Sequence, residues 1–484
     1  MSTTQEFRIP PTPIRRILYP FERFLRIESS GGILLLIAAV VAFIWANLPQ
    51  GAVVYHHFWH VPITINIGGI ALSMTLAHWI NDSLMGVFFF VVGLEIKREM
   101  LVGELSTPRQ AALPIAAAIG GMAVPALIYT IFNAGGPGSE GWGIPMATDI
   151  AFAVGIMAVL GRRAPLSLKI FITALAIVDD LGAVLVIALY YTGQINLTAL
   201  LIAGGLLLLM FVLNRVGVRH AGVYLVVGIG LWLALYYSGL HATLAGVLAA
   251  LAIPAKRHID SPQFVSHGRY YLNQFESAGS EGEQKIIPNP DQQNALHGLE
   301  ASLEAAESPM AKLEHIIHPW ARYAVMPLFA LANAGVTLLP SAEAAVKAAT
   351  HAATEAGTAV ASGAGIIAHL TIGQMLAQPV AIGVMLGLFL GKPIGIFLTS
   401  WIAIRTGLGV KPRGVSWTAL LGAGSLAGIG FTMSLFIADL GLPDGPLLTE
   451  AKIGFLAASF ASGIVGSIIL LMTGRGAKEP PAAG

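Results

Sequence analysis

The chain has 484 residues and a formal net charge of +1; only 11% of its residues are charged, whereas 55% are hydrophobic and the mean hydropathy is +0.74. A soluble core of this length does not need so much apolar surface, so the composition predicts a polytopic membrane protein. The near-zero net charge argues against a nucleic-acid partner. Since the chain contains no cysteine, disulfides and thiolate metal sites are excluded.

Apolar runs long enough to cross a bilayer recur along the chain. Residues 31–47 and 197–213 are typical, because about 17 residues is near the minimum with which a helix spans roughly 30 Å of hydrocarbon. Alternating segments of about ten residues, typical of barrels, do not occur, so the chain is predicted to be an all-α bundle of about twelve transmembrane helices. The expected spans are residues 31–48, 78–99, 110–132, 142–160, 166–191, 197–214, 221–238, 240–254, 316–339, 376–404, 415–439 and 449–473.

The Lys and Arg residues are distributed unevenly over the predicted loops. All but three of the 27 lie on the side that holds both termini, the exceptions being Lys347, Lys452 and the intramembrane Lys392. Because loops rich in Lys and Arg remain in the cytoplasm, both termini are expected there. The N-terminus has no cleavable signal pattern, so the first span is expected to be retained.

Two long connections interrupt the compact pattern of spans. Residues 257–312 are polar and fit a partly disordered cytoplasmic insertion with a short helix at 293–307. Residues 340–372 are rich in Ala, Gly and Thr and are expected to be an external insertion. The predicted organisation is a cytoplasmic N-terminus (1–30), a first membrane part (31–256), the polar insertion (257–312), a second membrane part (313–473) and a cytoplasmic tail (474–484).

The external connection 52–74 has a different pattern, in which an aromatic and histidine-rich stretch is followed by Ile-Thr-Ile-Asn-Ile-Gly-Gly. This pattern predicts a small hairpin, which can serve as an interaction surface. His56, His57 and His60 raise the alternative of a metal site, but no acidic residue lies nearby in the sequence. A solvated or interfacial histidine cluster is the favoured interpretation.

Four charged residues, Asp149, Asp179, Asp180 and Lys392, lie inside the predicted spans. A charge at the centre of a membrane helix costs roughly 2.5–3.5 kcal/mol on insertion scales. The default interpretation of such residues is therefore an ion or proton pathway.

Two predicted spans are interrupted by glycines. Around Asp149, the segment 143–155 contains Pro145 and flanking glycines, so the helix is expected to break there, with the Thr148 hydroxyl beside the carboxylate. The segment 422–434 is also rich in glycine but has no carboxylate. Interrupted spans in the two parts of the chain point to a transport site where broken helices cross. The alternative is that the glycines only permit close helix packing.

Asp179 and Asp180 are adjacent in the middle of the fifth span. Neighbours on a helix point about 100° apart, so one carboxylate can face an ion cavity while the other faces a second partner. In a dry setting, repulsion between two ionised carboxylates favours protonation of one of them. Carboxylate, hydroxyl and carbonyl oxygens are hard ligands that suit Na⁺ or Li⁺. Competition between H⁺ and such a cation for the same oxygens is sufficient for antiport.

Lys392 lies deep in the tenth span, where an unpaired ammonium would tend to lose its proton. An acidic partner is therefore expected. One interpretation is a salt bridge to Asp179 that breaks when the cation binds; the alternative is a purely stabilising counter-charge.

Several motifs of the chain resemble the motifs of one protein family and follow one another in the same order. They are Asn81-Asp-Ser-Leu-Met-Gly-Val-Phe-Phe-Phe-Val-Val-Gly-Leu-Glu95-Ile-Lys-Arg-Glu99, Ala-Thr148-Asp149-Ile-Ala-Phe-Ala, Asp179-Asp180-Leu-Gly-Ala, Ser-Gly-Leu-His241-Ala-Thr-Leu-Ala-Gly, Leu-Glu314-His315-Ile-Ile-His318-Pro-Trp, Phe-Ala-Leu-Ala-Asn-Ala-Gly335, Gly391-Lys392-Pro-Ile-Gly and Gly430-Phe-Thr-Met-Ser434. The chain resembles the NhaA-type sodium/proton antiporters of bacteria over nearly its whole length. That family is a known example of inverted repeats with broken helices, so the glycine pattern is not an independent test of the fold.

The resemblance implies an electrogenic exchanger in the bacterial cytoplasmic (inner) membrane that expels Na⁺ or Li⁺ and admits more protons than cations. By this resemblance, Asp179 and Asp180 form the exchange site that binds Na⁺, Thr148 and Asp149 lie at the crossing of spans four and eleven, and Lys392 supports the proton traffic. The expected partners are Na⁺, Li⁺, H⁺, the lipid bilayer and a second copy of the chain, paired partly through the hairpin. No cofactor is expected.

The resemblance also implies activation by alkaline pH through a cytoplasm-facing cluster. The matching residues are Glu95, Glu99, Glu314, His315 and His318, with His241 also linked to the pH response. The alternative is ordinary interfacial charge near helix ends. The insertions 257–312 and 340–372 are longer than the connections usual in that family.

Two other functions compete with antiport. Intramembrane aspartyl proteases use two aspartates on neighbouring helices, but their motifs resemble Tyr-Asp and Gly-x-Gly-Asp, whereas Thr precedes Asp149 and Val precedes Asp179. A proton-coupled carrier of an organic solute would need polar groups for a larger substrate, and the interrupted spans offer mainly small residues and hard oxygen ligands.

Overall fold

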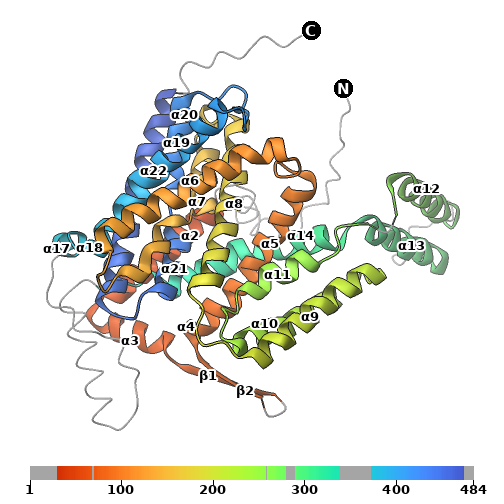
Figure 1. Cartoon of the computed structure of the whole chain (residues 1–484). Helices are drawn as coiled ribbons and strands as arrows, with labels where there is room; N and C mark the ends of the chain where they lie inside the picture. Colours follow the sequence, from red (N-terminus) through yellow and green to blue (C-terminus); the bar gives the residue numbers. More distant parts are fainter. Residues whose placement is uncertain (1–29, 68–69, 258, 280–288, 338–371, 474–484) are drawn as a thin grey trace. The chain divides into compact units, whose positions relative to one another are not determined.

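The computed structural model describes residues 30–67, 70–257, 259–279, 289–337 and 372–473 (Figure 1). These residues are helical almost throughout, and the described sheet is a single two-stranded hairpin. The chain is therefore an all-α polytopic membrane protein. It divides into two compact units, one formed by Met1–Asn81, Glu99–Tyr191 and Arg322–Gly484, the other by Asp82–Arg98 and Thr192–Ala321.

The first unit contains the charged spans. Its elements up to residue 191 are α2 (Ser30–Asn47), α3 (Pro49–Trp59), β1 (Pro62–Ile67), β2 (Ile70–Thr75), α4 (Leu76–His78), the start of the π-helical η1 (Trp79–Leu84), α6 (Pro108–Asn133), η2 (Ser139–Met146), α7 (Ile150–Val159), η3 (Gly161–Arg163) and α8 (Leu166–Tyr190). Its later elements are η4 (Ala321–Val325, from Arg322 on), α15 (Met326–Asn333), α17 (Ile372–Leu376), α18 (Pro379–Leu386), η5 (Gly387–Gly391), α19 (Lys392–Arg405), α20 (Trp417–Ala427), α21 (Phe431–Gly441) and α22 (Pro446–Thr473).

Close packing of α6 against α19 depends on two facing glycines. A Cβ on Gly395 would meet the carbonyl oxygen of Gly120, and a Cβ on Gly120 would meet the carbonyl oxygen of Gly395, both at under 2.5 Å. Because neither residue has a side chain, the two helix backbones approach one another directly. Lys392 lies one turn before Gly395 on α19, so this contact also positions the buried lysine.

The connection between the first two spans is only partly the hairpin that the sequence predicts. The hairpin is present as β1 and β2, paired antiparallel from Pro62↔Thr75 to Ile67↔Ile70. The stretch before it, expected to belong to the same hairpin, is instead the helix α3, which starts with Pro49 in its first turn. Proline at that position is preorganised for a helix, and Tyr55 and Trp59 on successive turns are buried.

Tyr55 anchors α3 to the end of α15. Its hydroxyl donates to the carbonyl oxygens of Leu331 (2.9 Å) and Ala332 (2.8 Å) and accepts from the backbone N–H of Gly335 (3.2 Å). A Cβ on Gly335 would lie 2.2 Å from the ring of Tyr55, so glycine is required for this contact. The glycine that closes the motif Phe-Ala-Leu-Ala-Asn-Ala-Gly335 therefore has a packing role.

The second unit consists of helices. They are α5 (Met85–Val102, up to Arg98), α9 (Leu197–Val216), α10 (Ala221–Ser238), α11 (Leu244–Ala252), α12 (Ser261–Ser277), α13 (Pro290–Ala306) and α14 (Pro309–Trp320). The apolar side chains of α9 are largely exposed, Leu201 at 69% and Leu208 at 64%, as expected for a face in contact with lipid.

The polar insertion is more structured than expected. The helix predicted at 293–307 is present as α13, and α12 forms a second helix that packs against it. Both helices begin with a reciprocal capping box, Asp260 with Gln263 and Asn289 with Gln292. These local signals explain why helices form in a segment with few apolar residues. Residues 280–288 lie outside the described part of the chain.

Nine helical segments of the described residues are long and apolar enough to cross a membrane, or ten if α20 and α21 count as one bent span. These ten agree with ten of the twelve predicted spans. The other two differ: residues 240–254 contain only the nine-residue α11, and residues 316–339 contain the end of α14 followed by η4 and α15. The count of twelve stays a prediction. The external insertion lies almost entirely within residues 338–371, outside the described part of the chain.

Candidate functional site at the crossing of two broken spans

Both interruptions predicted from glycine and proline are present in the first unit. The fourth span is a 3-10 helix, η2, that ends at Met146, followed by extended residues and then α7 from Ile150. In the later span, α20 ends at Ala427 and α21 starts at Phe431 after a bend of 46°. Each break leaves backbone groups without partners in their own helix, at positions inside the membrane-spanning segments.

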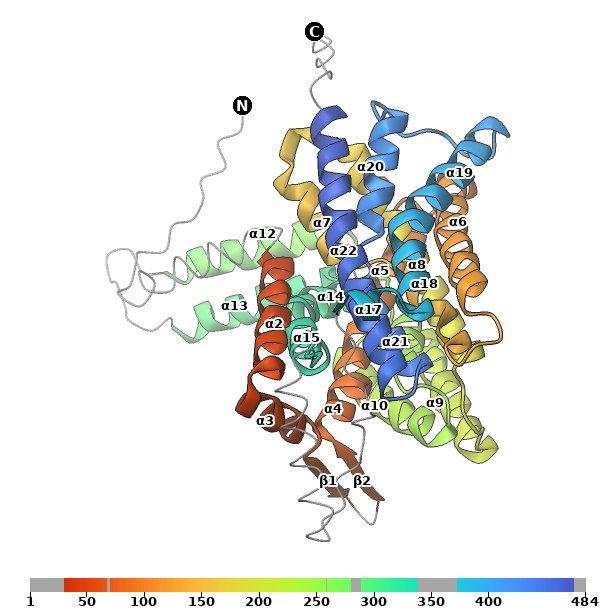
Figure 2. The same ribbon diagram turned by 90° about the vertical axis from the view of Figure 1, so that its left-hand side faces the viewer.

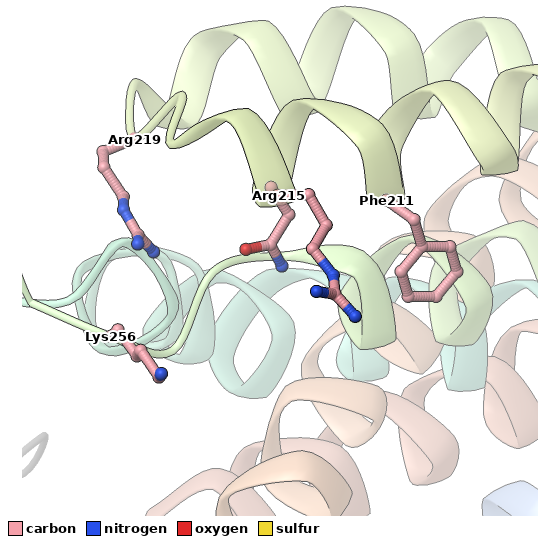
Figure 3. Close-up of a pocket in the computed structure, with 5 residues that line it drawn as sticks. Phe211, Arg215, Arg219 and Lys256 are labelled. Carbon is pink, nitrogen blue, oxygen red and sulfur yellow. The ribbon is translucent and has the colours of Figure 1, made fainter.

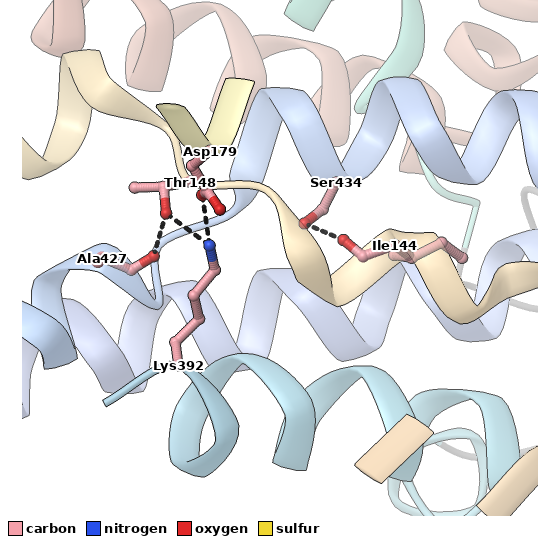
Figure 4. A network of polar contacts seen from close by, with 6 residues as sticks. All are labelled: Ile144, Thr148, Asp179, Lys392, Ala427 and Ser434. Carbon is pink, nitrogen blue, oxygen red and sulfur yellow. Dashed lines mark hydrogen bonds and ion pairs between the residues drawn. The ribbon is translucent and has the colours of Figure 1, made fainter. Parts of the chain in front are cut away.

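The two breaks satisfy each other's backbone groups (Figure 4). The Thr148 hydroxyl donates to the Ala427 carbonyl at the end of α20, at 2.9 Å, and the Asp149 N–H donates to the Ile429 carbonyl at 2.7 Å. Further along, the Ser434 hydroxyl donates to the Ile144 carbonyl at 2.9 Å. The crossing is therefore held by hydrogen bonds in both directions between the fourth and eleventh spans.

The Asp149 carboxylate is shared by two helix N-termini. Its Oδ1 accepts from the Phe152 N–H at 3.3 Å, which caps α7. Its Oδ2 accepts from the N–H (3.2 Å) and the hydroxyl (2.5 Å) of Thr432, in the first turn of α21. A negative charge at a helix N-terminus is favourable, and here one carboxylate serves two of them. This arrangement explains how Asp149 can be 98% buried in the interior of the unit.

Lys392 and Asp179 form an ion pair beside the crossing (Figure 4). Both side chains have 0% exposure, and the ammonium also donates to the Thr148 hydroxyl at 2.9 Å. Removing two charges from water is costly and is offset only when the groups pair closely, as they do here. The ion pair expected for Lys392 is thus present, and the lysine is linked through Thr148 to the carbonyl end of α20.

Local helix geometry places these two groups. Lys392 is the first residue of α19, directly after the π-helical turn η5 (Gly387–Gly391). π-helical turns occur frequently at functional sites. Asp179 lies in the middle of the regular helix α8 and is followed by Asp180, which is 1% exposed. Asp180 also interacts electrostatically with Lys392.

The oxygens gathered around Lys392 are all hard ligands. They belong to Asp179, Asp180, the Thr148 hydroxyl and, through it, the Ala427 carbonyl. Among the described residues, Oδ1 of Asp179 has no hydrogen-bond partner, so this carboxylate retains an acceptor while it holds the lysine. A small alkali cation is the substrate that such a set of oxygens fits. Binding it would require the ammonium to leave the carboxylate.

Three of the residues expected to respond to pH, together with Arg98, form two pairs in the second unit. Arg98 on α5 pairs with Glu314 on α14. One turn along each helix, Glu95 lies 3.5 Å from His318. The other basic residue of α5, Lys97, donates to the carbonyl oxygens of Leu251 and Ile253 at the end of α11.

The other residues of the predicted pH cluster are placed differently. Glu99 accepts from the Glu104 N–H at 3.0 Å, just beyond its own helix. His315 is exposed on α14, and His241 lies in the turn before α11, where its carbonyl accepts from Leu244 at 3.1 Å.

A basic pocket of about 570 Å³ lies in the second unit. None of the residues that line it belongs to the site formed by Asp149, Asp179 and Lys392. Arg215, Arg219 and Lys256 line it together with Phe211 and Asn214 (Figure 3). Its cationic lining suits an anion, so we do not assign it to cation transport.

Two residues of the crossing were not singled out from the sequence. Thr432 and Ser434 lie in a quoted motif, but nothing in the sequence distinguishes a hydroxyl that bonds a distant carboxylate from one that bonds its own helix. Arg98 was also missed as the partner of Glu314. The signal that was present is its spacing of three residues from Glu95, which puts both on one face of α5.

Comparison with known proteins identifies the family of the chain. The family described as Na⁺/H⁺ antiporter 1 matches residues 22–372 and 359–470. A Na⁺/H⁺ antiporter NhaA of Oleidesulfovibrio alaskensis is 47% identical over 473 residues, covering 98% of each chain. Another from Koribacter versatilis is 44% identical over 473 residues, covering 97% of this chain and 95% of the relative. These relatives have about the same length as this chain, so connections longer than usual are not peculiar to it. The chain belongs to the Na⁺/H⁺ antiporter 1 family.

Proposed function

We propose that the protein exchanges Na⁺, or Li⁺, for H⁺ across the bacterial cytoplasmic membrane at Asp179 and Asp180. The observation that carries this proposal is the fully buried ion pair between Lys392 and Asp179 beside two broken helices. A buried ammonium on a cation-binding carboxylate is a competitor for the transported ion. Transport then follows from one site that holds either protons or the cation, open to one side of the membrane at a time.

The proposed exchange step is a competition for carboxylate oxygens. When Na⁺ binds to Asp179 and Asp180, the Lys392 ammonium loses its partner and gives up its proton, and any proton on Asp180 also leaves. When Na⁺ departs, both groups take up protons again and the ion pair reforms. With two groups that release protons for one cation, the exchange is electrogenic. Thr148 and Asp149 hold the crossing, and Asp149 remains at the two helix N-termini.

This geometry favours exchange over intramembrane proteolysis. An aspartyl protease needs two carboxyl groups that share one water. Here the Asp149 carboxylate is engaged by Phe152 and Thr432, whereas Asp179 is paired with Lys392. The two aspartates therefore have separate partners.

We further propose that both termini face the cytoplasm, as the distribution of Lys and Arg predicts. In this orientation the paired residues of α5 and α14 belong to the cytoplasmic side. The proposed role of these pairs is to sense cytoplasmic pH, and the distance of 3.5 Å between Glu95 and His318 supports it. Glu99, His241, Glu314 and His315 belong to the same proposed response. The hairpin β1–β2 is the proposed contact between two copies of the chain.

Proton movement in everted membrane vesicles tests the proposed exchange. Added Na⁺ or Li⁺ should release protons from vesicles that hold a pH gradient, and K⁺ should not. Asp180→Asn should abolish this release, whereas the matched control Asp444→Asn, at an exposed position, should not change it. Measurement from about pH 6.5 to 9 would show any activation of exchange by alkaline pH. An Asp180→Asn variant that exchanges at the wild-type rate would rule out the assigned site.

A further inference from the structure

A second group of polar side chains lies in the first unit, where three elements meet. Asn81 comes from η1, Asn333 is the last residue of α15, and Asp439 lies in the last turn of α21. The Asn81 amide donates to the Asp439 carboxylate at 2.6 Å and to the Asn333 amide oxygen at 3.2 Å, and the Asn333 amide donates back to the Asn81 oxygen at 2.7 Å. Three amide or carboxylate side chains are thus linked in one place within apolar helices.

This group is aligned with the crossing along one helix face. Thr432, which binds Asp149, and Asp439 are seven residues apart on α21. Seven residues correspond to about 10 Å along a helix and to nearly two full turns, leaving the two side chains only about 20° apart in direction. One face of α21 therefore has a polar group near each end.

Aromatic side chains fill the space between these two polar groups. Phe436 lies between Thr432 and Asp439 on α21 and is 1% exposed. Its ring packs edge-on against Phe329 of α15, with centroids 6.2 Å apart. Phe329 precedes Asn333 by one turn, so the same two helices pair first through aromatic rings and then through polar groups. The two helices α15 and α21 contact one another, and both are labelled in Figure 2.

The surroundings of Asp439 resemble those of Asp179 in charge. Lys452 of α22 interacts electrostatically with Asp439, as do His78 and Asp444. Asn81 belongs to a π-helical turn, just as Lys392 directly follows one. Such turns are frequent at functional sites. A carboxylate, a nearby lysine and a π-helical turn therefore occur twice in this unit.

We propose that Asn81, Asn333 and Asp439 form a second binding site for the transported alkali cation, separated from the crossing by the aromatic pair Phe329 and Phe436. This inference rests on the proposed exchange and adds to it a route for the cation between the outer face and the crossing. The predicted topology puts this end of α21 at the outer face of the membrane. The site supplies one carboxylate and two amide oxygens, all hard ligands. Rotation of the Asn81 amide presents its oxygen to a cation beside Asp439 in place of its N–H groups.

A purely structural role for Asp439 makes a different prediction. If Asp439 only accepts the Asn81 hydrogen bond, Asp439→Asn retains an acceptor oxygen and should leave transport unchanged. If Asp439 binds the cation, the same substitution removes the anionic ligand. Loss of such a ligand lowers cation affinity about tenfold or more.

The test compares Na⁺ dependence at the two faces of the membrane. Exchange is measured in right-side-out and everted vesicles with wild type, Asp439→Asn, Asp439→Glu and the control Glu140→Gln, at an exposed position in η2. We expect Asp439→Asn to raise the apparent KM for Na⁺ at the outer face about tenfold without a matching change at the cytoplasmic face. Asp439→Glu, which keeps the charge, should recover most of the affinity, and Glu140→Gln should behave as wild type.

Three results would overturn the second site while exchange itself persists. They are an unchanged outer KM in Asp439→Asn, an equal change at both faces, or an equal change in Glu140→Gln. If Asp439→Asn does not fold, a Phe436→Leu variant tests the same path. The smaller side chain in the aromatic pair should alter the apparent KM for Na⁺ at the outer face and leave the cytoplasmic KM unchanged. No change at either face would also overturn the proposal. Failure of wild type to exchange would instead contradict the proposed function.

Discussion

The ion pair between Lys392 and Asp179 predicts a strong and specific coupling between the two side chains. Lys392→Met removes the ammonium and leaves a carboxylate with 0% exposure and no cation beside it. Breaking a buried pair from one side costs about 3–5 kcal/mol, because the remaining charge stays desolvated. Asp179→Asn should cost a similar amount, because it leaves the buried Lys392 ammonium without its carboxylate. In the double variant neither charge remains, so most of that cost should disappear.

The four proteins form a double-mutant cycle, measured as free energies of unfolding in mixed micelles. We expect a coupling of about 5 kcal/mol or more between Lys392 and Asp179, because two single costs of about 3–5 kcal/mol largely disappear in the double variant. The exposed pair of Lys312 and Glu304, at 2.5 Å, is the matched control and should show much smaller coupling, since water and salt screen it. Additive effects of Lys392→Met and Asp179→Asn would refute the reasoning that the two buried charges offset one another.

Three further predictions concern other parts of the first unit. Asp149→Ala should destabilise the protein by about 2–4 kcal/mol, because the hydrogen bonds from Thr432 and Phe152 are lost. Asp149→Asn should destabilise it by less, because the amide keeps an acceptor oxygen. Equal thermal stability of the two variants would argue against this role of the Asp149 hydrogen bonds. Gly335→Ala should lower the unfolding temperature because its Cβ would lie 2.2 Å from the Tyr55 ring; an unchanged temperature would show that α3 adjusts freely. Burial, with the charges of His60 and Lys452, lowers the pKa of His56 from its ordinary 6.5 to about 4. The folded state thus keeps His56 neutral, so stability present above pH 6.5 should fall by up to about 2 kcal/mol as the pH drops to about 5. His56→Gln should remove this part of the pH dependence of unfolding, and an identical profile would contradict it.

The sequence predicted the membrane class and the positions of the two breaks because both depend on local composition. Pro145 and the clustered glycines weaken a helix wherever they occur, so the interruptions before Ile150 and after Ala427 were visible in advance. The partner of Lys392 was also predictable, because an unpaired buried ammonium is costly and few intramembrane carboxylates were available.

The contacts between the breaks could not be predicted. These contacts depend on how spans far apart in the sequence cross. They include the hydrogen bond from Thr148 to the Ala427 carbonyl and the capping of two helices by Asp149. The helix α3 was missed because a stretch rich in aromatic and histidine residues also suits a strand, and its burial against α15 through Tyr55 decides in favour of the helix. In the polar insertion, the capping boxes of α12 and α13 were readable signals that composition alone obscured.

Proton release on cation binding tests the central claim most directly. Purified protein in weakly buffered detergent solution is titrated with Na⁺, and bound cation and released protons are counted together. The account predicts that wild type releases protons as Na⁺ binds, and that Asp180→Asn and Lys392→Met release fewer. Binding of Na⁺ with no proton release would contradict competition between cation and proton at Asp179, Asp180 and Lys392.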